Sequence, residues 1–168
     1  MGKRTRLVAS LLPLLLFCAP PSLARDPETW AGSERWTRTE PPINLLHIEE
    51  GEINRRGEAV GYHHRPNGAD PPGARVLRIV QPPDASGVYR AIVALQEPAT
   101  GTWLRKKAPS TFYPDAMSTG EVVEAILEAF HHAEPGGGQF HGPSGRGFAI
   151  EGWYQHGRIN AAYPLRGR

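Results

Sequence analysis

Only one segment of this 168-residue chain has the pattern of a long helix, and this limits the available folds more than any other feature. Ser118 and Glu121 form a capping box, and the apolar residues that follow recur on one helical face. We therefore predict a helix over residues 119–133, ending before Glu134 and Pro135. Elsewhere the 19 glycines and 17 prolines favour short strands and turns.

The remaining apolar segments have the composition of β-strands. They are short, rich in branched and aromatic residues, and separated by glycine, proline, asparagine and aspartate. The sum predicts an α+β domain in which antiparallel β-sheets pack against one main helix. The expected strands are residues 43–53, 57–64, 74–80, 87–95, 102–107, 147–155 and 158–165, the last two forming a hairpin.

The first 24 residues have the layout of a secretory signal peptide. A basic start is followed by an apolar stretch over residues 7–18 and by small residues that end at Ala24. Pro13 interrupts the apolar stretch, which is shorter than a bilayer span, so we expect cleavage and no stable membrane anchor. The alternatives are an uncleaved anchor and a lipid on Cys18. We expect the protein to be exported, to the periplasm or the extracellular space.

The positive charge of the chain belongs to this first segment. The chain has 19 Lys and Arg against 17 Asp and Glu, and Lys3, Arg4 and Arg6 lie before the cleavage point. Removing those three leaves 16 basic groups against 17 acidic ones, so we expect few phosphate contacts and a shallow salt dependence. Cys18 is the only cysteine, which excludes cysteine catalysis, thiolate metal sites and disulfides in residues 25–168.

The rest of the chain divides into two parts by composition. Residues 25–42 are polar and end in two prolines, which indicates a linker or an extended lead-in. Residues 43–168 are long enough for one compact domain with its own core.

Histidines and lysines are the side chains with the most chemistry. His47 lies in an apolar segment, and His63 and His64 end the next one. On paired strands only one of the two adjacent histidines shares a face with His47. Two imidazoles and a fixed cation, here Lys106 or Lys107, suffice to cleave RNA through its ribose 2′-hydroxyl. The structural alternatives are core or edge histidines and a solvated lysine pair.

Other catalytic patterns are weak or absent in the sequence. There is no His-Glu-x-x-His, Gly-x-Ser-x-Gly or P-loop motif, and the adjacent histidines lack zinc-ligand spacing. The loop at residues 142–147, which contains Ser144, has the composition either of a phosphate-binding turn or of a plain one.

The order of these residues resembles the EndoU endoribonucleases. The matching pieces are His47 to Glu52, Gly61 to His63, the lysine pair followed by Ser110 to Pro114, the helix, a glycine-rich loop and the final hairpin through Tyr163. They cover residues 43–165. The resemblance implies a barnase-like ribonuclease fold, and domain boundaries of 1–24 for the signal, 25–42 for the lead-in and 43–168 for the nuclease.

The resemblance also implies roles for individual residues. His47 and His63 correspond to the acid–base pair, and the third catalytic group is Lys106 or Lys107, depending on whether Ser110 or Thr111 is the reference hydroxyl. Tyr163 corresponds to a residue that holds the uridine, with Phe148 and Trp153 as further stacking candidates. Ala161 departs from the family, which has a hydroxyl residue there, and this bears on uridine preference more than on catalysis.

We therefore expect an exported endoribonuclease that cleaves single-stranded RNA, at uridines, to a 2′,3′-cyclic phosphate. The sequence shows no evident metal site and implies no cofactor, although some family members need manganese. The expected partners are RNA and a cognate inhibitor or immunity protein. The alternatives are a non-enzymatic exported binding module on the same fold and a metal-dependent hydrolase.

Overall fold

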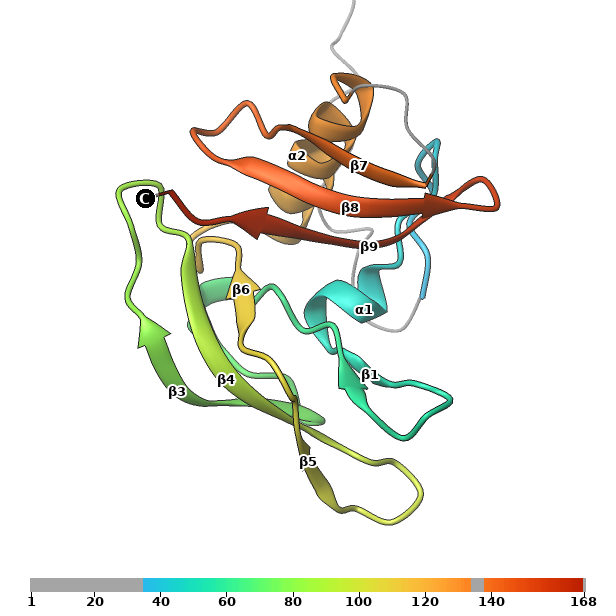
Figure 1. The fold of residues 1–168 in the computed structure, drawn as a ribbon, viewed down its shortest axis with the longest axis vertical. Helices are drawn as coiled ribbons and strands as arrows, with labels where there is room; N and C mark the ends of the chain where they lie inside the picture. The colour runs from blue at the N-terminus through green and yellow to red at the C-terminus, as the bar shows by residue number, and fades with distance from the viewer. Residues whose placement is uncertain (1–34, 134–137, 168) are drawn as a thin grey trace, which may run out of the picture.

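The computed structural model describes residues 35–133 and 138–167. These residues form antiparallel sheets with one main helix, so the predicted α+β class is confirmed (Figure 1). The predicted signal peptide, and residues 25–34 of the predicted lead-in, lie outside the described residues. The helices are α1 (Leu45–Glu49), the 3-10 turn η2 (Pro66–Gly68) and α2 (Thr119–His131). The strands are β1 (Glu52–Ile53), β2 (Ala59–Val60), β3 (Ala74–Gln81), β4 (Tyr89–Gln96), β5 (Trp103–Arg105), β6 (Ser110–Phe112), β7 (Gln139–Pro143), β8 (Ala149–Gln155) and β9 (Arg158–Leu165).

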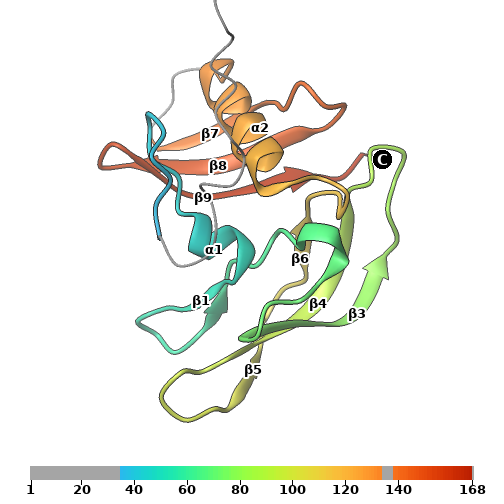
Figure 2. The ribbon, with the colours of Figure 1, turned by 180° about the vertical axis from the view of Figure 1, so that it is seen from behind.

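The C-terminal half is a three-stranded antiparallel sheet, β7-β8-β9, crossed by α2 (Figure 2). The helix begins at the predicted capping box, with the Ser118 side chain accepting from the Glu121 amide, and ends two residues earlier than predicted. Its apolar face, including Ile126, packs with Ile150 of β8 in one hydrophobic core. The predicted hairpin is confirmed as β8 and β9, whereas the sequence analysis did not predict β7.

The second sheet is built around β4. β3 pairs along one side of β4, while β6 and β5 pair with the two ends of its other side. Its inward residues, among them Val93, pack with Tyr62 and Phe112 in a second hydrophobic core. The strands predicted at 74–80 and 87–95 are confirmed, the one predicted at 102–107 is shortened to Trp103–Arg105, and β6 was not predicted.

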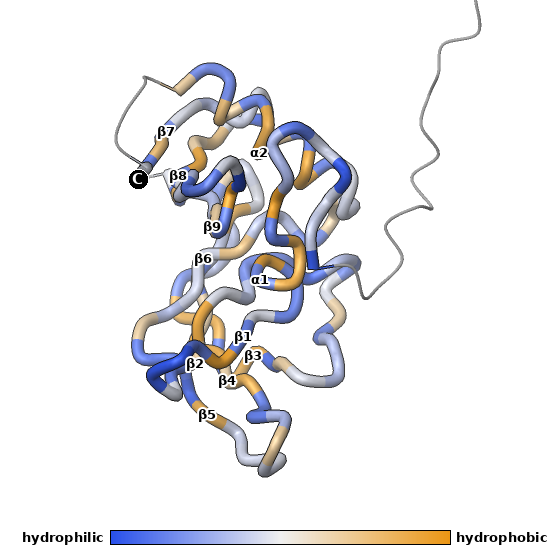
Figure 3. Tube along the Cα trace, turned by 90° about the vertical axis from the view of Figure 1, so that its right-hand side faces the viewer, coloured by the Kyte–Doolittle hydropathy of each residue, from blue (hydrophilic) through white to orange (hydrophobic). Residues whose placement is uncertain are grey.

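The segment predicted as a strand over residues 43–53 is instead the short helix α1 followed by β1. The Asn44 side chain caps α1 by accepting from the His47 amide at 3.3 Å, and Leu45 and Ile48 are buried one turn apart. The strand prediction was wrong because a short apolar run fits the two-residue period of a strand as well as the period of a helix. Figure 3 shows α1 as a hydrophobic segment between the two sheets.

The strand predicted over residues 57–64 is also much shorter, because β2 ends at Val60. Gly61 and Tyr62 both have left-handed backbone angles, with φ of 76° and 61°, which turn the chain away from β1. Three amides in this segment bond to carbonyls of α1. The Tyr62 amide donates to the His47 carbonyl, and the His63 and His64 amides donate to the Ile48 carbonyl.

Residues 35–42, the described part of the predicted lead-in, contact the domain directly. Thr37 is buried; its amide donates to the Ile43 carbonyl at 2.9 Å, and its hydroxyl accepts from the Ile43 amide at 2.8 Å. Arg35 pairs with Glu52.

Within residues 35–133 and 138–167, no helix is long and apolar enough to cross a membrane.

Candidate active site

The turn at Gly61 and Tyr62 brings the two predicted catalytic histidines together. The His47 carbonyl accepts from the Tyr62 amide at 2.8 Å, so α1 and the segment that carries His63 are joined by backbone. The His47 and His63 rings lie with centroids 6.0 Å apart. His64 points away and bonds to Glu49 and to the Met117 carbonyl. Only His63 therefore faces His47, as expected, although a turn and not strand alternation separates the adjacent pair.

Both histidines line a cavity of about 370 Å³ between the two sheets. Its walls come from α1, from the segment after β2, from β4 and β6, and from the final hairpin. The cavity is lined by His47, Val60, Gly61, His63, Arg90, Lys106, Ala108, Pro109, Thr111, Trp153, Ala161 and Tyr163. None of these twelve residues is acidic, so the cavity suits an anionic ligand.

His63 is held as a neutral imidazole. Its side chain is buried, and burial, followed by the positive charges of Lys106 and His47, lowers its pKa well below the ordinary value of 6.5. Nδ1 lies 2.8 Å from the Thr111 carbonyl oxygen. Because a carbonyl only accepts, Nδ1 must carry the proton, and Nε2 of the neutral ring carries the lone pair.

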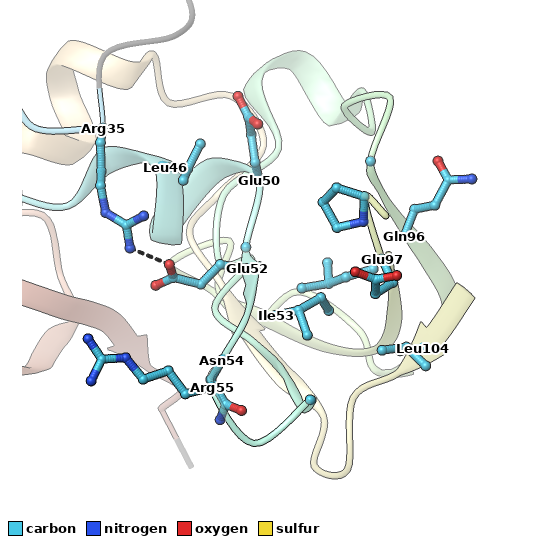
Figure 4. A pocket seen from close by; sticks show the side chains of 15 residues that line it. Arg35, Leu46, Glu50, Glu52, Ile53, Asn54, Arg55, Gln96, Glu97 and Leu104 are labelled. Atoms are coloured by element: carbon cyan, nitrogen blue, oxygen red, sulfur yellow. Dashed lines mark hydrogen bonds and ion pairs between the residues drawn. The ribbon is translucent and has the colours of Figure 1, made fainter. Parts of the chain in front are cut away.

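His47 has a carboxylate partner instead. Its Nδ1 lies 3.0 Å from Oε1 of Glu52, while Oε2 of the same carboxylate pairs with Arg35. The hydrogen bond to His47 is the main cause of a Glu52 pKa lowered to about 2, so the carboxylate stays ionised. Figure 4 shows Arg35 and Glu52 facing one another beside a second cavity of about 750 Å³. An ionised Glu52 fixes the orientation of the His47 ring through Nδ1.

The structure separates the two candidate lysines. Lys106 lines the cavity, and its Nζ donates to the Gly61 carbonyl at 2.9 Å and to Ser110 Oγ at 2.8 Å. Burial lowers the pKa of Lys106 to about 8. Lys107 points away from the cavity, with 83% of its side chain exposed, and pairs with Glu58. Only Lys106 is therefore brought beside the histidines.

Of the predicted substrate-binding residues, some line the cavity and others do not. Ser110 is buried and bonds to both Lys106 and the Gly61 carbonyl, so it positions the lysine and does not line the cavity. Thr111 lines the cavity, and its carbonyl holds His63. Tyr163 stacks on His63 at 5.2 Å between centroids and donates to Glu151.

The last hairpin supplies one wall of aromatic rings. Trp153 lies beside Tyr163, with centroids 5.7 Å apart, and both line the cavity. Ala161 also lines it, at the position where the sequence analysis expected a hydroxyl residue. Phe148, a further stacking candidate, is instead buried in the core around α2.

Ser144 is not brought to the cavity. It is 2% exposed, donates to the Phe148 carbonyl at 2.5 Å and accepts from the Arg146 amide, so its hydroxyl closes a turn. Of the two alternatives that the composition left open, a phosphate-binding turn and a plain turn, this arrangement favours the plain turn. Among the described residues, no three His, Cys, Asp or Glu side chains are grouped as metal ligands.

The comparisons with known proteins agree with this arrangement. Residues 44–166 match the family model of the bacterial EndoU nuclease. The chain belongs to this family. It is also 32% identical over 126 residues to a Bacillus cereus protein named Toxin, a match that covers 73% of this chain and 22% of that protein. The EndoU domain thus spans about a fifth of the length of this relative, and no solved structure matches it.

Two residues important to this site gave little signal in the sequence: Glu52, which holds His47 from behind the cavity, and Arg90, which lines the cavity. Glu52 lay inside the motif that carried the family resemblance, but its contact with His47 depends on α1 and β1, which were predicted as one strand. Arg90 is a single cationic residue in the otherwise apolar strand β4. Strand alternation places its side chain on the face of the sheet opposite to that of Ala91. Only the pairing of β4 with β6 shows that the Arg90 face meets the cavity.

Proposed function

We propose that this EndoU domain cleaves single-stranded RNA by attack of a ribose 2′-hydroxyl on the adjacent phosphate, giving a 2′,3′-cyclic phosphate. The observation that carries the proposal is the arrangement of His47, His63 and Lys106 around one cavity with no acidic lining residue. Two imidazoles supply a general base and a general acid. The lysine supplies a fixed charge for the oxygens of the phosphorane.

The hydrogen bonds support an assignment of the two proton transfers. His63 is neutral and carries its lone pair on Nε2, so it accepts the proton of the 2′-hydroxyl as that oxygen attacks phosphorus. We assign the other transfer to His47, whose Nδ1 is held by Glu52, so that it donates a proton to the departing 5′-oxygen. The O2′–P bond forms, the P–O5′ bond breaks, and the two histidines exchange their protonation states.

The aromatic wall suggests how the substrate is held. Tyr163 and Trp153 offer stacking surfaces for unpaired bases next to His63, which favours single-stranded RNA over a duplex. The family resemblance supports a preference for uridine. Since Ala161 has no hydroxyl to bond a base edge, we expect that preference to rest on Tyr163 and on backbone groups.

We further propose that the protein is exported and is countered by an inhibitor. The signal-like segment at residues 1–24 supports export, and the similarity to a protein named Toxin supports a role against other cells. An RNase with this role needs either separation from the RNA of its producer or a cognate immunity protein. Co-purification with the product of a neighbouring gene tests the second.

The direct test is cleavage of a uridine-containing oligoribonucleotide by the wild type and by the His47→Ala and His63→Ala variants. We expect the wild type to cleave it without added metal and each variant to lose at least about 100-fold in rate. Equal cleavage by all three proteins excludes the proposed mechanism. Cleavage that depends wholly on added manganese indicates a metal-dependent hydrolase instead, and no cleavage by any protein favours a binding module.

A further inference from the structure

Arg90 is a cation of the cavity that the proposed proton transfers do not use. It lies on β4 directly across from Thr111 of β6, and the two side chains share the face that lines the cavity. This wall is separate from α1, which carries His47, and from the turn that carries His63. Arg90 therefore brings a second fixed positive charge into the cavity from another element.

The guanidinium of Arg90 lacks an ionic partner among the described residues. Its Nε is buried and makes no hydrogen bond, and its remaining contact is a long one, 3.5 Å, from Nη1 to Gln81 Oε1. Two other partly buried guanidiniums are paired with carboxylates: Arg65 with Asp70 and Asp115, and Arg146 with Glu121 and Glu124. Arg166, whose Nε also has no hydrogen bond, donates to two backbone carbonyls and does not line the cavity. A half-buried arginine without a carboxylate, in a cavity without acidic lining, is arranged for an anion from outside the chain.

The chemistry of that anion follows from the shape of the side chain. A guanidinium presents a planar fork of N–H donors that matches two oxygens of a phosphate, whereas Lys106 acts as a point charge. Lys106 is tied to Gly61, between the segments that carry the two histidines, and therefore faces the phosphate that reacts. Arg90 enters the cavity from β4, across from Thr111 and away from the segments that carry the two histidines, and is placed for a different phosphate of the same strand.

We propose that Arg90 forms a second phosphate subsite, which binds the backbone phosphate next to the one that is cleaved. This inference rests on the proposed function and extends it to substrate selection. It implies that the domain distinguishes a nucleotide within a chain from the same nucleotide at an unphosphorylated end. It also supplies a local phosphate contact that the near-neutral charge of residues 25–168 does not suggest.

The test compares substrates that differ only in flanking phosphates. The dinucleoside monophosphate UpA carries the scissile phosphate alone, while pUpA and UpAp carry one more on either side. We expect the wild type to have a kcat/KM for at least one of the longer substrates about tenfold above that for UpA, and Arg90→Gln to bring this ratio close to one. Arg90→Lys, which keeps the charge without the fork, should retain part of the ratio.

Arg78→Gln serves as the matched control, because Arg78 is exposed on β3 and does not line the cavity. It should leave the ratio unchanged. An unchanged ratio in Arg90→Gln overturns the proposal, whether or not overall cleavage falls, because Arg90 then acts on the reacting phosphate or only on the fold.

A binding experiment separates this proposal from the proposed function. Calorimetry with 2′-deoxyuridine 3′,5′-bisphosphate and with the 3′-monophosphate involves no cleavage, since neither ligand has a 2′-hydroxyl. We expect the bisphosphate to bind about tenfold more tightly, and the advantage to disappear in Arg90→Gln. Equal binding of the two ligands by the wild type, together with equal kcat/KM for UpAp and UpA, overturns the subsite even if RNA is cleaved. Absence of RNA cleavage with the binding difference intact overturns only the proposed function.

Discussion

The two histidines of the cavity differ in the group that each Nδ1 contacts, and this difference decides their chemistry. A backbone carbonyl holds His63, while an ionised carboxylate holds His47. The carbonyl fixes the Nδ1-protonated tautomer of His63, whereas the carboxylate fixes the orientation of the His47 ring. In the proposed mechanism, the two side chains take opposite halves of a proton exchange.

The adjacent lysines provide a matched pair for testing the fixed cation. Lys106→Met should lower kcat/KM by about 100- to 1,000-fold, because it removes the buried charge beside the reacting phosphate. Lys107→Met should change it by less than about twofold, since Lys107 is exposed and forms a surface ion pair. Steady-state kinetics on one oligoribonucleotide give both values, and a larger effect at Lys107 would reverse the assignment.

The pH profile of kcat/KM reports the state of the general base. Because burial and the nearby charges lower the pKa of His63, its ring stays unprotonated, and active, at pH values well below 6.5. We therefore expect the acidic limb of the profile below pH 6.5, and a decline above about pH 8 as Lys106 loses its proton. In Lys106→Met the acidic limb should move to higher pH, since one of the charges that lowers the pKa of His63 is gone. An acidic limb at or above pH 6.5 in the wild type contradicts the assignment of His63 as base.

At the scale of elements, a short helix and a tight turn build the site where the sequence pattern indicated two strands. α1 presents His47 and offers its last carbonyls to the amides of residues 62–64. The turn requires left-handed angles at Gly61 and at Tyr62, and the Tyr62 side chain is anchored in the second core. These contacts join residues on both sides of β1 and β2, so local periodicity does not reveal them.

Gly61 is the residue on which this junction depends. A Cβ at position 61 would lie 2.2 Å from the His47 carbonyl oxygen, so Gly61→Ala must push α1 and the His63 segment apart. Gly57→Ala is the control, because Gly57 has a similar φ of 73° but no atom within 4 Å of the added Cβ. Chemical denaturation should show a loss of about 1 kcal/mol for Gly57→Ala and clearly more for Gly61→Ala. Activity should fall strongly in Gly61→Ala alone, and equal effects would contradict the account of this turn.

At the scale of the molecule, the cavity lies where the two sheets and α1 meet. β9 and Tyr163 come from the C-terminal sheet, and Arg90 and Thr111 come from the other. The histidines come from α1 and from the segment after β2, which precede both sheets in the chain. The fold class, the main helix, the long strands and the histidine–lysine set were predictable, because each has a local signature. Arg90 and the orientation of Lys106 were not, because both depend on which strand pairs with β4. Ser144 was predicted from composition alone, and its hydroxyl bonds only to backbone groups of its own turn.

The packing of α2 on its sheet depends on a close backbone approach at Gly142. A Cβ there would lie 2.0 Å from the Ala129 carbonyl oxygen of α2. Gly142→Ala should therefore lower the free energy of unfolding by about 1–3 kcal/mol, as overpacking does. Gly120→Ala, at an open position in the first turn of α2, should be neutral or stabilising by up to about 1 kcal/mol. Thermal melts of both variants measure the difference, and a neutral Gly142→Ala would contradict the packing described for α2.

The central claim is that the ribose 2′-hydroxyl is the nucleophile, and a substrate with a single ribonucleotide tests it most directly. A DNA oligonucleotide with one uridine in ribose form should be cut once, after that uridine, and mass spectrometry should show a 2′,3′-cyclic phosphate on the 5′ fragment. The all-deoxy oligonucleotide should remain intact, because it has no internal nucleophile. Cleavage of the all-deoxy strand, or a product that carries a 5′-phosphate, would contradict the account.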